Sequence, residues 1–117
     1  MSQNFPRFGH ERALLVIALC GLVAGAALAL AAEPVEVRQA GRHFAPDRLK
    51  LKRGTAVDFI NDEDVVHHAF VTTPAFSADT GDISPGESKR IVFDRIGKFD
   101  VRCAIHPQMA LAVEVTE

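Results

Sequence analysis

Three side chains that bind soft metals stand close together near the end of the chain. In the stretch CAIHPQM, residues 103–109, Cys103, His106 and Met109 follow one another at intervals of three residues. A compact loop with this spacing can bring the thiol, the imidazole and the thioether to one point. Soft sulfur ligands select copper, zinc or iron–sulfur centres. An iron–sulfur cluster needs four thiolates, and structural zinc needs more Cys or His than the loop supplies. The spacing therefore favours copper, in a site that a second His would complete.

A second imidazole is available in the pair His67 and His68, which follows the polar turn NDEDVV. Adjacent residues of a strand point to opposite faces, so only one of the pair can share an interior with Cys103. The alternation does not choose between them, because apolar residues lie on both faces. We expect His43 to be an ordinary surface or packing residue. We interpret the acidic run DED, residues 62–64, as a solvent-exposed face.

The elements that must position these residues are β-strands. Phe99, Val101 and Cys103 share one face of a period-two pattern, so the thiol points into the end of an apolar core. The same alternation recurs in residues 48–52, 57–59, 91–93 and 111–116. Turn formers separate these runs about every ten residues, a spacing typical of a sandwich or barrel. The fold class we predict is all-β, a Greek-key β-sandwich of about seven or eight strands.

Two segments of the sequence depart from this pattern. Residues 73–87 hold two prolines and two glycines, and we expect an irregular stretch there that crosses between sheets. Residues 13–32 are uncharged, follow Arg7 and Arg12, and match a secretory signal cleaved after Ala31. A retained membrane anchor is the alternative, since the run just reaches the length of a bilayer span. We therefore expect a signal peptide at 1–31 and one domain at 32–117, exported to the periplasm or tethered to its membrane.

Export limits what the cysteines can do. Cys20 lies within the leader, so the exported domain keeps Cys103 alone and has no internal disulfide. A lone thiol in that compartment is a packing residue, an intermolecular link, a nucleophile or a metal ligand. The formal net charge is −2, and the chain has no Trp or Tyr and no basic stripe. These features exclude nucleic acid as an expected partner.

Residues 44–115 resemble the cupredoxins, the small blue-copper electron carriers. The C-x-x-H-P-x-M loop is most similar to those of amicyanin-like and plastocyanin-like members, and the lead-in GKFDVRC and the N-x5-H spacing from Asn61 also fit. The resemblance implies that His67 is the first ligand and that Cys103, His106 and Met109 complete a type 1 site with one copper per chain. The family often has Asn after this first His, where the chain has His68. That difference raises the question of whether His68 competes for the metal.

The resemblance also implies a function. The chain is expected to be a monomeric carrier of single electrons in the periplasm, and not an enzyme, because four protein ligands leave no position for substrate. A donor dehydrogenase or an acceptor cytochrome would dock near His106. One alternative is a copper chaperone or storage protein. Another is a thiol enzyme with Cys103 as nucleophile and a His as base, which the inward direction of the thiol disfavours.

Overall fold

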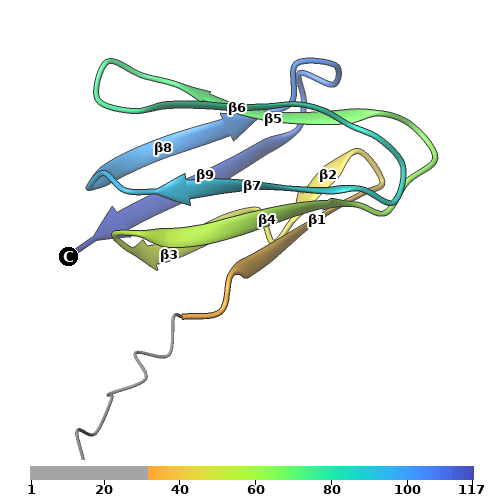
Figure 1. The fold of residues 1–117 in the computed structure, drawn as a ribbon. Helices are drawn as coiled ribbons and strands as arrows, with labels where there is room; N and C mark the ends of the chain where they lie inside the picture. Colours follow the sequence, from red (N-terminus) through yellow and green to blue (C-terminus); the bar gives the residue numbers. More distant parts are fainter. Residues whose placement is uncertain (1–31) are drawn as a thin grey trace, which may run out of the picture.

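The computed structural model describes residues 32–117, and every regular element assigned within them is a strand (Figure 1). The nine strands are β1 (Val35–Ala40), β2 (His43–Ala45), β3 (Arg48–Lys52), β4 (Thr55–Asn61), β5 (His67–Thr72), β6 (Ser77–Ile83), β7 (Ser88–Phe93), β8 (Gly97–Arg102) and β9 (Ala110–Thr116). The predicted all-β class is confirmed, with slightly more strands than expected. Within residues 32–117, no helix is long and apolar enough to cross a membrane. The predicted leader, residues 1–31, lies outside the described part of the chain.

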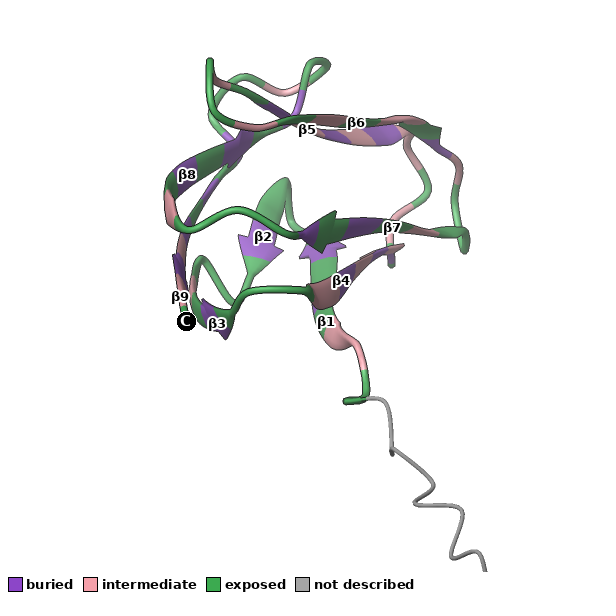
Figure 2. Ribbon diagram, turned by 60° about the vertical axis from the view of Figure 1, so that its left-hand side comes forward, coloured by how far each residue is buried: buried purple, intermediate pink, exposed green. Residues whose placement is uncertain are grey.

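The strands form two sheets that face each other (Figures 1 and 2). One sheet has the order β2-β1-β4-β7, and the other has the order β3-β9-β8-β5-β6. The pairs β1–β4 and β3–β9 are parallel, and the remaining neighbours are antiparallel. Because neighbouring strands in each sheet are often distant in sequence, the chain crosses repeatedly between the layers, as in a Greek key.

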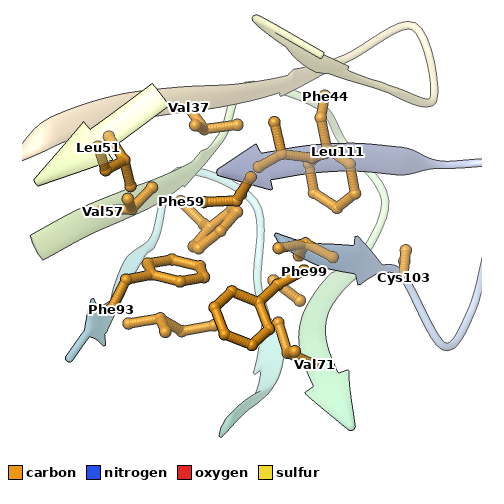
Figure 3. Packing of buried hydrophobic residues seen from close by; sticks show 14 of the residues in the cluster. Val37, Phe44, Leu51, Val57, Phe59, Val71, Phe93, Phe99, Cys103 and Leu111 are labelled. Carbon is orange, nitrogen blue, oxygen red and sulfur yellow. The ribbon is translucent and has the colours of Figure 1, made fainter. Parts of the chain in front are cut away.

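The core lies between the two sheets and is built by alternation along each strand. In Figure 2 buried residues alternate with exposed or intermediate residues along most strands, as expected when one face of each sheet is covered. Aromatic rings fill the middle of this core (Figure 3), with Phe44 and Phe59 in edge contact at 5.9 Å between ring centroids. Phe93 of β7 and Phe99 of β8, which belong to opposite sheets, lie 6.4 Å apart between ring centroids. The inward faces therefore carry a packed apolar interior that ends at Cys103, beyond the arrowhead of β8 (Figure 3).

Phe59 provides a direct test of this core, because its side chain is fully buried. We expect Phe59→Ala to lower the free energy of unfolding of the metal-free protein by about 3–5 kcal/mol, since a large cavity replaces the ring. Urea unfolding measures the change. Val92→Ala is the matched control, because Val92 is 48% exposed on β7 and should change stability by less than about 0.5 kcal/mol. Equal effects of the two substitutions would contradict the described core.

The expectation of an irregular stretch over residues 73–87 was wrong at its centre. Residues Ser77–Ile83 form β6, which pairs antiparallel with β5 and ends the five-stranded sheet. An edge strand of this kind is largely solvated, so its sequence, SADTGDI, lacks the apolar alternation that marks the other strands. The crossing between sheets lies where it was expected, between the end of β6 and the start of β7.

Candidate metal centre

One end of the sandwich brings three of the four predicted ligands together, His67, Cys103 and His106. Strand β5 begins at His67, and β8, which is antiparallel to it, ends next to Cys103. The loop of residues 103–109 then turns back into β9 (Figure 1, blue loop). Within the loop, the backbone N–H of Met109 donates to the carbonyl of His106 at 2.9 Å. The start of one strand and the end of another thus place two distant segments at one point.

The geometry of the cluster fits one metal ion. The ligand atoms of His67, Cys103 and His106 all lie within 4.8 Å of one another, and within residues 32–117 this is the one such group of His, Cys, Asp or Glu. The Cys103 sulfur lies 3.8 Å from Nδ1 of His106, and the two imidazole rings are 4.9 Å apart between centroids. Met109 is fully buried at the end of the same loop, whereas His106 is partly exposed.

The ring of His67 shows most directly that this cluster suits a metal. Its Nε2 lies 2.9 Å from a carboxylate oxygen of Glu63. Its Nδ1 is buried and has no hydrogen-bond partner, a condition shared within the described residues only by Oε1 of Gln39. Buried polar atoms are normally bonded. A carboxylate that accepts the Nε2 proton leaves Nδ1 with a free lone pair, which is the arrangement of a metal-binding His.

Glu63 is the functional residue that the sequence interpretation missed. Its side chain is only 15% exposed, whereas Asp62 and Asp64 on either side are exposed, so the expectation of a solvated DED face was wrong at its middle residue. One carboxylate oxygen accepts the backbone N–H of Arg42 at 2.6 Å, and the other contacts His67. The Arg42 hydrogen bond is the main reason that the pKa of Glu63 lies below its usual value, and the contact with His67 acts in the same direction. The four-residue spacing from Glu63 to His67 was the available signal.

Asn61 organises the loop that carries Glu63. Its amide nitrogen donates to the carbonyls of Val65 at 2.7 Å and Ile83 at 2.9 Å, and its amide oxygen accepts the backbone N–H of Glu63 at 2.9 Å. The side chain is 1% exposed. Asn61 is therefore more than a turn residue, because it joins the loop before β5 to the end of β6 and holds Glu63 in place.

His68 points away from the cluster, as the alternation of a strand requires for one of the pair. Its ring contacts Asp79 and lies 3.6 Å from Asp82, both on β6. The pKa of Asp79 is lowered mainly by the backbone N–H of Gly81, and the His68 contact adds to this. His68 is thus held on the outer face of the sheet and does not compete with His67. His43 is exposed on β2, in agreement with the expected surface role.

Comparison with known proteins finds a relative that the chain matches along most of its length. No protein-family model matches the chain. The methylamine utilization protein MauL of Methylorubrum extorquens is 32% identical over 103 residues, which cover 87% of this chain and 90% of that protein.

Solved structures of copper proteins share the fold. The Cu-containing nitrite reductase NirK of Thermus scotoductus aligns with a TM-score of 0.69 and 31% identity over 75% of this chain, although the chain spans only 23% of that enzyme. A proline-to-glycine variant of amicyanin in its reduced Cu(I) form aligns with a TM-score of 0.67 and 22% identity, over 74% of this chain and 85% of amicyanin. Together with the near full-length match to MauL and the clustered His, Cys and His, these likenesses show that the chain belongs to the cupredoxins, the blue-copper proteins.

Proposed function

We propose that this cupredoxin is a periplasmic carrier of single electrons in which His67, Cys103, His106 and Met109 hold one type 1 copper ion. The observation that carries the proposal is the buried, unpartnered Nδ1 of His67 beside a buried thiol and a second imidazole. Copper bound by this set would supply a Cu(II)/Cu(I) couple whose potential depends on the weak axial thioether.

The ligand-bearing segments are held in place by contacts within the protein. Glu63 holds the ring of His67, Asn61 holds the loop before β5, and Cys103 follows a strand of the sandwich. Such fixed ligands favour electron transfer, because little has to move between the two oxidation states. A chaperone or storage protein has to release its ion, and three of the four side chains here are at most 2% exposed.

The partly exposed ligand gives electrons a route to partner proteins. His106 lies on the loop between β8 and β9, and Ile105 beside it is 46% exposed. We propose that this surface docks a donor dehydrogenase and an acceptor cytochrome in small, short-lived contacts. The name of the MauL relative connects that protein with methylamine utilization, so a substrate-oxidising dehydrogenase is the first donor to test.

The location belongs to the same proposal. The uncharged stretch in residues 1–31, with arginines before it and a small-residue cleavage pattern at its end, supports export of the domain 32–117 to the periplasm. We propose that this domain acts there as a monomer. The absence of an open position among four protein ligands supports a carrier rather than an enzyme.

Titration with Cu(II) tests the proposed site. We expect purified residues 32–117 to bind one equivalent of Cu(II) and to develop an intense thiolate-to-copper absorption with a narrow copper hyperfine splitting in electron paramagnetic resonance. Zn(II), which has no redox couple, is the control and should give no colour. A rapid loss of Cu(I) to a competing chelator would favour a chaperone, and a titration without the intense band would refute the proposal.

A further inference from the structure

Three buried polar side chains occur in the core of residues 32–117, and all of them lie near the metal centre. They are Gln39, Asn61 and His67, each at most 1% exposed. Gln39 stands near the end of β1, directly opposite Asn61 of β4 in the parallel register. Asn61 is buried because it joins the loop before β5 to β6, and His67 because its ring faces the metal centre, whereas neither reason applies to Gln39.

The backbone that carries His67 is held by the sheet mainly from one side. On the β6 side, His67 is opposite Ile83 and His68 is opposite Asp82. On the β8 side, the pairing recorded in the described residues is confined to Phe70 with Arg102. The register also shifts between His68 and Phe70. A further contact from the opposite sheet would therefore hold the first residues of β5 more firmly.

Gln39 makes such a contact from the opposite sheet. Its Nε2 donates to the carbonyl of His68, one peptide unit after the ligand, at 3.4 Å. The carbonyl of Gln39 accepts the backbone N–H of Asp62 at 3.1 Å, so the same residue also holds the loop before β5.

The side chain is a poor choice for core stability alone. Its Oε1 is buried with no hydrogen-bond partner, and its single side-chain hydrogen bond is long. An apolar side chain of similar volume would avoid the cost of burying an unpaired amide oxygen. The benefit of Gln39 therefore lies in what its N–H group holds.

We propose that Gln39 is a positioning residue of the copper centre: its amide fixes the His67–His68 backbone from across the sandwich and so sets the orientation of the His67 ring. This inference rests on the copper site proposed above and assigns to it a residue that binds no metal. The side chain of His68 cannot take this role, because it faces outward and contacts Asp79 and Asp82.

Replacement of Gln39 by Met tests the proposal, because Met keeps the volume and removes the donor. In metal-free protein we expect the Ala69 amide, which shares a peptide unit with the His68 carbonyl and donates to Oγ1 of Thr80 at 3.0 Å, to exchange its hydrogen at least about tenfold faster. In the copper-loaded protein we expect a changed copper hyperfine splitting and reduction potential. The urea midpoint of the metal-free protein should equal or exceed that of the wild type.

Val37→Ala is the matched control, because Val37 lies two residues earlier on the same buried face of β1. It should lower the urea midpoint and leave the copper spectrum unchanged.

Unchanged Ala69 exchange and an unchanged spectrum in Gln39→Met would overturn the inference while the copper site stands. Should Gln39→Met not fold, Gln39→Leu is measured in the same way, and failure of both to fold would show a purely structural role and overturn the inference. A colourless wild-type protein would refute the proposed function, whereas Ala69 exchange would still decide whether Gln39 fixes the His67–His68 backbone.

Discussion

Cys103→Ser is expected to abolish the intense visible absorption of the copper-loaded protein and to lower its copper affinity by more than about 100-fold. Loss of a residue that only orients a metal ligand lowers metal affinity by about 10–100-fold. Cys103 should matter more, because it is itself the thiolate donor in the proposed set. A hydroxyl of similar size is a harder ligand that soft copper binds weakly. Visible absorption and competition with a chelator of known affinity measure the two effects.

His68→Gln is the matched control for this loss. His68 is adjacent to His67 but faces the outer surface with Asp79 and Asp82, so its replacement should leave the absorption and the affinity close to wild type. Urea unfolding of both metal-free variants shows whether each still folds. Retention of the band in Cys103→Ser, or its loss in His68→Gln, would contradict the assignment of ligands.

The loop and the strands that position it were predictable because their signals are local. The spacing of Cys103, His106 and Met109 sets which atoms a short loop can gather. The alternation with Phe99 and Val101 sets the inward direction of the thiol, which the structure confirms with 2% exposure. Where one face of a strand is buried and the other is solvated, period-two patterning determines the orientation of each side chain.

Other features depend on contacts that no short segment encodes. Strand β6 has a polar sequence because it ends the sheet. Apolar residues on both sides of His67 and His68 leave their directions undecided by pattern alone, and resemblance, not periodicity, selected His67. The carboxylate of Glu63 stands in an acidic run that resembles any solvated loop, until the folded loop turns it toward the ring of His67. The pairing of Gln39 with His68 joins residues of opposite sheets.

The second large effect is expected at Glu63, where Glu63→Ala should lower copper affinity by about 10–100-fold. The substitution removes the acceptor of the His67 Nε2 proton, so the ring loses both its fixed tautomer and part of its basicity. The substitution also removes a negative charge beside the site. Because a negative charge stabilises Cu(II) more than Cu(I), its removal favours Cu(I), and the reduction potential should rise. Chelator competition measures the affinity, and voltammetry of the copper-loaded protein measures the potential.

Two further variants separate the hydrogen bond of Glu63 from its charge. Glu63→Gln keeps one acceptor oxygen for the two groups that the carboxylate serves, the N–H of Arg42 and the ring of His67, so its affinity should lie between those of wild type and Glu63→Ala. Asp64→Asn removes a neighbouring exposed charge and should shift the potential less, because solvent screens it. If Asp64→Asn raises the potential as much as Glu63→Ala and neither changes the affinity, Glu63 acts only through its charge. In that case the tautomer of His67 must be fixed by something other than this carboxylate.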